Sequence, residues 1–304
     1  MEAKKPTEPL CVAFLDEPDA HIAGTKWATK LFAHIPHKRV AQPGQADILV
    51  LMDMTTNDHA KNEAILRKQL ALRRGKPLLV FLHDDPSEPM NLSISANNVL
   101  ILRTSVNRST LCAYEQLLPS FQAADLEVKC LAPAACLNVT KPFIGFCGVG
   151  KWPSRKAACD VLNANSALFD LRFIFRYDHH TRQNKNDQAT FKREFEEVMT
   201  QCPYQICCRG CGNFSHRFFE TLASGRIPVL IDTDTVLPPH VPKAMWERCI
   251  VMSKTAEDLP KDILAFHAKH DVALTQIMCR NLWQTYLSIP GYATYMEKQI
   301  KHLV

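Results

Sequence analysis

One segment in the second half of the chain constrains the fold most, because strand, turn and helix signals alternate within it. The apolar runs 204–208 and 227–231 are typical of buried strands. The turn 209–212 contains two glycines, and Ser215 and Gly225 are good start and stop residues for the helix between the strands. A strand, a turn, a helix and a second strand in this order predict a parallel β-sheet.

The start of this predicted helix carries the chemistry. The first N–H groups of a helix have no partner within the helix, and together with the helix dipole they attract anions. Arg209 and Arg217 flank this point and add guanidinium groups that match the geometry of phosphate. Glu220 can share a helix face with Arg217, and its carboxylate suits the hydroxyls of a ribose. The segment therefore predicts a sugar-nucleotide site.

The run 208–229 reads Cys-Arg-Gly-x-Gly-Asn-Phe-Ser-x-Arg-Phe-Phe-Glu-x-Leu-Ala-x-Gly-Arg-Ile-Pro-Val, and Leu-Pro at 237–238 and Trp246 follow it. This order resembles the core motif of the exostosin-like glycosyltransferases. The Gly-Asn-Phe-Ser variant is similar to that of their short, soluble microbial or viral members. The resemblance covers roughly 140–265 and departs from the family at Cys208, where a proline is common.

The rest of the chain also alternates between strand and helix signals. Strands are predicted at 10–15, 48–53, 77–82, 99–102, 143–146, 171–177 and 249–252. Helices are predicted at 21–34, 59–74, 111–118, 154–164, 191–199, 257–268, 272–288 and 291–303. The segment 132–142 contains prolines and alanines and is the expected linker.

These elements and the length of 304 residues predict an α/β protein of two domains. The exostosin resemblance implies the GT-B fold, in which two Rossmann-like domains face each other across a cleft. We expect an acceptor-binding domain at 1–138 and a nucleotide-sugar-binding domain at 139–304. The last helix, 291–303, is expected to cross back and pack on the first domain.

The resemblance also implies a set of donor ligands at the carboxyl ends of the second domain's strands. The residues expected to bind the donor nucleotide are Arg155, Arg209, Gly212, Asn213, Ser215, Arg217 and Glu220. Simpler roles stay open for several of them. Ser215 is expected to cap the helix with or without a phosphate contact, and Arg155 is alternatively a solvated first-turn residue. Arg217 and Glu220 alternatively form a surface ion pair.

Asp232-Thr233-Asp234 spells the Asp-x-Asp signature with which other glycosyltransferases bind manganese. We interpret it as a loop near the donor sugar, with Thr233 and Asp234 bonding sugar hydroxyls; a metal site and a simple Asx turn are the alternatives. A UDP-sugar is the expected donor substrate. No permanently bound cofactor is expected, nor a requirement for a divalent metal.

A catalytic base is expected at the strand ends of the first domain, where a carboxylate or histidine would take the proton of the acceptor hydroxyl. Asp16 and Asp84 are the leading candidates, and Asp53, His83 and Asp85 stand in comparable positions. Ordinary loop capping is the alternative for each.

Composition limits the partners. A net charge of +5 suits an anionic nucleotide sugar, but no Lys/Arg block suggests nucleic acid. No stretch approaches the roughly 20 apolar residues of a membrane span, and the N-terminus lacks a signal-peptide pattern. A cytoplasmic protein is therefore expected, in which the 12 cysteines are reduced thiols.

We therefore expect a transferase that moves a sugar, with xylose favoured, from a UDP-sugar to a glycan hydroxyl by inverting single displacement. Two alternatives stay open. A catalytically silent protein would bind nucleotide sugars without turnover, whereas a DNA-base glycosyltransferase would bind duplex DNA in a strongly salt-dependent way.

Overall fold

The computed structural model describes residues 9–15, 27–54, 59–83, 98–120, 140–176, 185–213 and 215–304. The chain divides into two compact units. Unit 1 comprises Met1–Pro119, Val236–Pro238 and Ile289–Val304, and unit 2 comprises Ser120–Thr235 and Pro239–Ser288. The C-terminal end of the chain thus belongs to the same unit as the N-terminal end.

Unit 1 is built on a six-stranded parallel sheet with the order β2-β1-β3-β4-β5-β6. Its strands are β1 (Leu10–Leu15), β2 (His37–Arg39), β3 (Ile48–Met54), β4 (Leu78–Leu82), β5 (Val99–Arg103) and β6 (Glu115–Leu117). The central strands β4 and β5 are buried along their whole length. Continuous burial is typical of parallel strands with both faces covered by helices.

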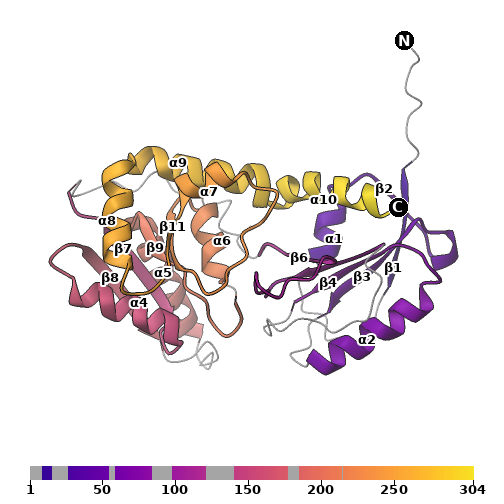
Figure 1. The fold of residues 1–304 in the computed structure, drawn as a ribbon, viewed down its shortest axis with the longest axis horizontal. Coiled ribbons are helices and arrows are strands. Elements are labelled where there is room, and N and C mark those ends of the chain that lie inside the picture. The colour runs from indigo at the N-terminus through magenta and orange to yellow at the C-terminus, as the bar shows by residue number, and fades with distance from the viewer. Residues whose placement is uncertain are drawn as a thin grey trace, which may run out of the picture. The chain divides into compact units, whose positions relative to one another are not determined.

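Helices cover both faces of this sheet (Figure 1). They are α1 (Trp27–Phe32), α2 (His59–Leu72) and α10 (Ile289–Leu303), and Pro43–Gln45 forms the short 3-10 helix η1. Ile65 and Leu66 of α2 pack against β3, β4 and β5 on one face. On the other face α1 packs against β3 and α10, and Tyr295 Oη of α10 donates to Gln116 Oε1 at 2.9 Å.

Unit 2 is built on a five-stranded parallel sheet with the order β11-β10-β9-β7-β8. Its strands are β7 (Phe143–Val149), β8 (Asp170–Arg176), β9 (Tyr204–Ile206), β10 (Ile227–Ile231) and β11 (Val251–Ser253). Along the chain each strand precedes a helix, so the helix N-termini lie toward the carboxyl edge of the sheet. Both units therefore have a Rossmann-like α/β architecture.

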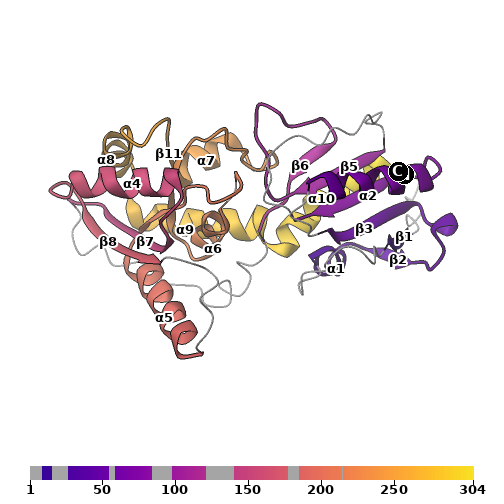
Figure 2. The ribbon, with the colours of Figure 1, turned by 90° about the horizontal axis from the view of Figure 1, so that it is seen from below.

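The helices of unit 2 again lie on both faces, with α4 and α5 on opposite sides of β7 and β8 (Figure 2). They are α4 (Pro153–Ala164), α5 (Lys185–Gln201), α6 (His216–Ala223), α7 (Lys243–Cys249), α8 (Leu259–Lys269), α9 (Val272–Leu282) and the π-helical turn η3 (Trp283–Leu287). Gly225 ends α6 with a φ of +65°, as the sequence predicted.

Two predictions of secondary structure are wrong in unit 1. The predicted helix at 111–118 is replaced by strand β6, and the edge strand β2 was not predicted. The reason is a distant partner: Glu115 is buried and pairs with Arg103 at 2.8 Å while β6 extends the sheet next to β5. The spacing of the leucines within 111–118 does not indicate this pairing.

The helix boundaries near the C-terminus also differ from the prediction. The predicted helix 272–288 ends as α9 at Leu282 and continues only as the π-helical turn η3. The last helix begins at Ile289, so Pro290 lies in its first turn instead of before it. Proline is tolerated there because the N–H that it lacks has no partner within the helix.

Candidate functional site at the carboxyl edge of the second sheet

The start of α6 has the geometry of a helix N-terminus but lacks the predicted side-chain cap. Ser215 takes the N-cap position with an extended backbone (φ −140°, ψ 113°), yet its side chain forms no capping hydrogen bond. Its Oγ is buried and has no hydrogen-bond partner in the described part of the chain. The prediction that Ser215 caps α6 is therefore wrong for the side chain. A buried hydroxyl at this position is instead available to a ligand.

Arg155 lies in the first turn of α4, and its guanidinium bridges the ends of two strands. Nε donates to the carbonyl oxygen of Cys208 at 3.1 Å, and Nη1 donates to that of Val149 at 3.3 Å. The alternative of a solvated first-turn residue is therefore wrong. Burial lowers the pKa of Arg155, and the charge of Arg217 lowers it further.

Arg217, in the first turn of α6, reaches the same edge from the other side of β7. Its Nη2 donates to the carbonyl oxygen of Cys147 at 2.5 Å, and its Nε pairs with Glu220 Oε2 at 3.4 Å. The guanidinium also lies over the ring of Phe195, 4.6 Å from its centre. Nη1 is buried without a hydrogen-bond partner among the described residues. The ion pair with Glu220 is thus present, but within the described ranges it leaves Nη1 of the Arg217 guanidinium without a hydrogen-bond partner.

The two guanidinium groups therefore raise each other's electrostatic energy at one edge of the sheet. Within the described ranges Arg155 forms no ion pair, and Arg217 has only Glu220. Partly buried like charges are relieved by an anion that bonds both. A ligand with two adjacent phosphate groups has the charge and the donor-matching oxygens for this arrangement.

The glycine turn after β9 is shaped around Arg155. A Cβ on Gly210 would lie 2.9 Å from Nη2 of Arg155, so a side chain there would displace the guanidinium. Ser154 Oγ donates to the carbonyl oxygen of Arg209 at 3.3 Å and fixes the turn from α4. Ser154 itself lies within α4, whose N-cap position is Trp152. Arg209 itself is half-buried, and its Nη2 donates to the carbonyl oxygen of Cys211 at 3.3 Å.

Asn213 ties the turn to the loop after β10. Its Nδ2 donates to the carbonyl oxygen of Asp234 at 3.1 Å, and its Oδ1 accepts from Thr233 Oγ1 at 2.7 Å. Asp232 Oδ1 accepts from the N–H of Thr235 at 3.0 Å, three residues on and not the two of an Asx turn. Asp234 has a φ of +66° in this loop. Asn213 and Thr233 therefore satisfy each other, and the loop is held next to the start of α6.

No protein-family model matches the sequence, and no curated protein matches it significantly. Among solved structures, the lipopolysaccharide outer core galactosyltransferase WaaB in its apo form is similar with a TM-score of 0.56 and 10% identity. That match covers 96% of this chain and 100% of WaaB. HepE of Anabaena, in complex with UDP-glucose, is matched with a TM-score of 0.47 and 12% identity over 96% of this chain and 98% of HepE.

The chain has the GT-B fold. Two Rossmann-like units with parallel sheets, seen here and in the glycosyltransferase WaaB, confirm the fold class predicted from the sequence. In open α/β sheets, ligands bind outside the carboxyl ends of the strands. The edge that carries Arg155, Arg217 and the start of α6 is such a position in unit 2.

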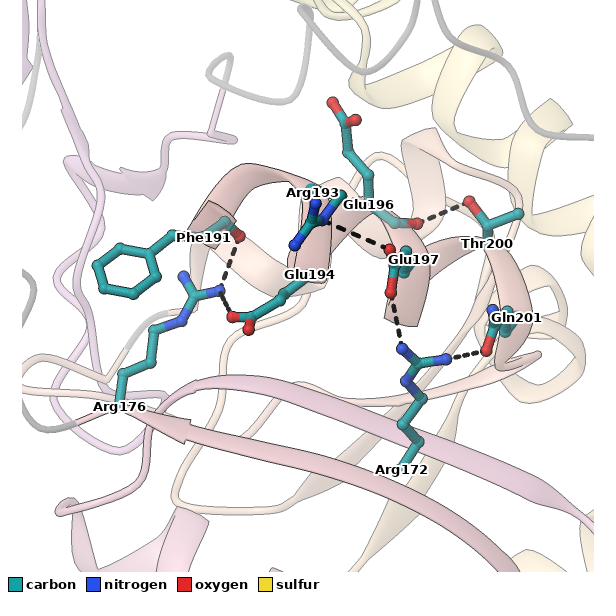
Figure 3. Close-up of polar contacts among 9 residues, drawn as sticks. All are labelled: Arg172, Arg176, Phe191, Arg193, Glu194, Glu196, Glu197, Thr200 and Gln201. Atoms are coloured by element: carbon teal, nitrogen blue, oxygen red, sulfur yellow. Dashed lines mark hydrogen bonds and ion pairs between the residues drawn. The ribbon is translucent and has the colours of Figure 1, made fainter. Parts of the chain in front are cut away.

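The α5 face of this GT-B unit is held by ion pairs that the sequence analysis did not single out (Figure 3). Arg172 pairs with Glu197 at 2.8 Å, and Arg176 pairs with Glu194 at 3.0 Å. These contacts fix the helix that carries the aromatic ring beneath Arg217. A signal was present: two arginines four positions apart on one face of a strand, and two glutamates three apart on the next helix.

Cysteines near the carboxyl edge of the unit 2 sheet are structural. Cys202, Cys207 and Cys208 are buried, and desolvation raises the pKa of the first two thiols to about 12 and that of Cys208 to about 11. Such thiols are poor metal ligands, which bind as thiolates. Across the described ranges, no group of three or more His, Cys, Asp or Glu side chains is arranged to hold a metal ion.

The candidate bases of unit 1 are only partly visible. Asp16, Asp84 and Asp85 lie outside the described residues, as does the side chain of Asp53. His83 follows β4, and its ring meets the edge of the buried Trp27 ring, with 4.3 Å between centres. The catalytic base thus stays a prediction.

None of the helices in the described ranges combines the length and the apolar character that crossing a bilayer requires.

Proposed function

We propose that the chain is a glycosyltransferase that binds the diphosphate of a nucleotide sugar at the carboxyl edge of the unit 2 sheet. The observation that carries this proposal is the convergence of Arg155 and Arg217 there, with backbone carbonyls as their main partners. The start of α6 adds the positive end of a helix dipole and the buried hydroxyl of Ser215. Arg209 and the loop at 232–235 complete the proposed donor site.

The finer features of the proposal rest on the exostosin-like motif at 208–229. The motif supports a UDP-sugar as donor, with xylose favoured, and a glycan hydroxyl as acceptor. Glu220 is proposed to accept hydrogen bonds from the ribose once the nucleotide draws Arg217 toward the phosphates. Thr233 and Asp234 are proposed to lie near the donor sugar.

In the proposed reaction, the acceptor hydroxyl attacks the anomeric carbon of the sugar while the bond to the β-phosphate oxygen breaks. A carboxylate of unit 1, Asp16 or Asp84, takes the hydroxyl proton. Negative charge builds on the leaving UDP, and the guanidinium groups stabilise it. One preorganised hydrogen-bond donor of this kind contributes about 2.7–4 kcal/mol in measured enzymes.

Arg209 offers the clearest test of the donor site. Among the described residues its side chain bonds Cys211 within the turn, so Arg209→Ala removes a proposed phosphate ligand without breaking the strand ends that Arg155 holds. Titration calorimetry with UDP is expected to show a loss of affinity of roughly tenfold or more, the loss typical of a charge-assisted hydrogen bond. Arg193→Ala is the matched control, because Arg193 is an exposed arginine on α5 with 70% of its side chain accessible.

Unchanged UDP affinity in Arg209→Ala would count against the proposed site. A screen of sugar nucleotides for hydrolysis and transfer then separates enzyme from binding protein. Release of UDP from at least one sugar nucleotide is expected. Binding of every nucleotide sugar tested without turnover of any would instead identify a silent binding protein.

A further inference from the structure

Phe175 stands at the carboxyl end of β8 with 50% of its surface exposed, although it belongs to a parallel sheet. Its ring packs against two other rings, those of Phe146 at 5.7 Å and Phe173 at 6.3 Å between centres. A fixed and half-exposed aromatic ring presents a flat surface to a planar ligand.

Two glycines, Gly148 in β7 and Gly150 directly after it, lie close to this ring or to Arg217. Gly148 lies opposite Phe175 in the register of β7 and β8, and a Cβ on it would lie 3.5 Å from Nη2 of Arg217. A Cβ on Gly150 would lie 2.4 Å from Cδ1 of Phe175. A side chain at Gly150 would therefore displace the ring of Phe175, whereas one at Gly148 would be in ordinary contact with Arg217.

The order of the strands determines which groups lie on each side of β7. β7 lies between β9 and β8. Arg155 bonds the carbonyls of Val149 and Cys208 on the β9 side, whereas Phe175 stands on the β8 side. A nucleotide whose diphosphate lies between the guanidinium groups therefore extends across the end of β7, and its base reaches the ring on β8.

We propose that Phe175 is the stacking platform for the nucleobase of the donor nucleotide. The inference rests on the proposed function, since it takes the diphosphate to lie at Arg155 and Arg217. Every base has a π-face, so stacking of this kind tolerates different bases. Phe175 then contributes affinity for nucleoside diphosphates as a class, and the choice of uracil is made by other contacts.

The test is titration calorimetry of the full chain with UDP, ADP and inorganic pyrophosphate. Phe175→Ala is expected to weaken UDP and ADP binding by similar factors, about tenfold, and to leave pyrophosphate binding unchanged. Phe175→Tyr keeps the ring and is expected to restore affinity to within about twofold of the wild type. Leu168→Ala is the control, because Leu168 is also apolar and 43% exposed. It lies before the amino end of β8, away from the carboxyl edge.

Three outcomes would overturn the inference, and they are distinguishable. Unchanged UDP affinity in Phe175→Ala, with pyrophosphate still bound, removes the stacking role and keeps the diphosphate site. Equal losses for UDP and pyrophosphate show a general disturbance of the edge. Failure of the wild type to bind either ligand contradicts the proposed function, and the inference with it.

Discussion

At the residue scale, Gly145 is a glycine at which an added side chain would have no room. A Cβ there would lie 2.7 Å from Cγ1 of Val198 and 2.9 Å from Cβ of Cys202, both on the α5 side of β7. Gly145→Ala is therefore expected to lower the free energy of unfolding by about 1–3 kcal/mol through overpacking. Gly44→Ala is the control, because nothing lies within 4 Å of the added methyl group. Urea denaturation measures both, and equal stabilities would contradict the close packing of α5 on β7.

The buried thiols of unit 2 predict a loss of stability in alkali. Burial raises the pKa of Cys159, Cys202 and Cys207 to about 12, from 9.0 for a free thiol. Above pH 9 the unfolded chain therefore binds fewer protons than the folded one, so the free energy of unfolding falls as pH rises toward 12. Below pH 9 the thiols add no pH dependence.

Urea midpoints between pH 8 and 10.5 check this prediction. The expected decrease is on the order of 1 kcal/mol per buried thiol for each pH unit above 9. Other groups titrate in the same range, so the informative quantity is the slope. Cys207→Ala is expected to flatten it, whereas a slope identical to that of the wild type would contradict burial of the neutral thiol.

At the scale of the elements, Arg226 joins the ends of two helices in unit 2. Its guanidinium donates to the carbonyl oxygens of Met199 and Thr200 on α5 and to that of Gly225 after α6, at 2.8, 3.2 and 3.1 Å. It also donates to Gln276 Oε1 of α9 at 3.0 Å. A fully buried charge with these partners holds α5, α6 and α9 together.

Loss of this contact is expected to be costly. Arg226→Ala leaves several buried carbonyls without donors, and we expect the free energy of unfolding to decrease by about 3–5 kcal/mol. Arg226→Lys keeps the charge but not the fork, so an intermediate loss is expected. Arg193→Ala, on the exposed face of α5, should change stability by less than about 0.5 kcal/mol. A loss for Arg226→Ala as small as that of the control would refute the capping role.

Elements whose sequence signals lie close together could be predicted, whereas elements that depend on distant partners could not. The segment from β9 to β10 was predicted because an apolar run, two glycines and a helix stop lie close together in the sequence. Strand β6 was missed because its register is set by Arg103 and β5. At the site, Arg155 and Arg217 were singled out by position, but their carbonyl partners belong to other strands. The uncapped hydroxyl of Ser215 likewise depends on how the turn folds.

At the scale of the whole molecule, the two units share one architecture but differ in the side chains at the carboxyl ends of their strands. Unit 2 brings two guanidinium groups and a helix N-terminus to one edge of its sheet. The described part of unit 1 contributes His83 at the end of β4, packed on Trp27. The GT-B fold by itself is compatible with several activities, so the donor site carries the functional proposal.

A crystal structure of the chain with UDP would show directly whether the carboxyl edge of the unit 2 sheet binds the diphosphate. We expect the diphosphate at the start of α6, within hydrogen-bonding distance of Arg155, Arg217 or Arg209. Arg217 Nη1 and Ser215 Oγ, which have no hydrogen-bond partner among the described residues, should gain partners there. UDP bound away from this edge, with both guanidinium groups still on their strand carbonyls, would contradict this expectation.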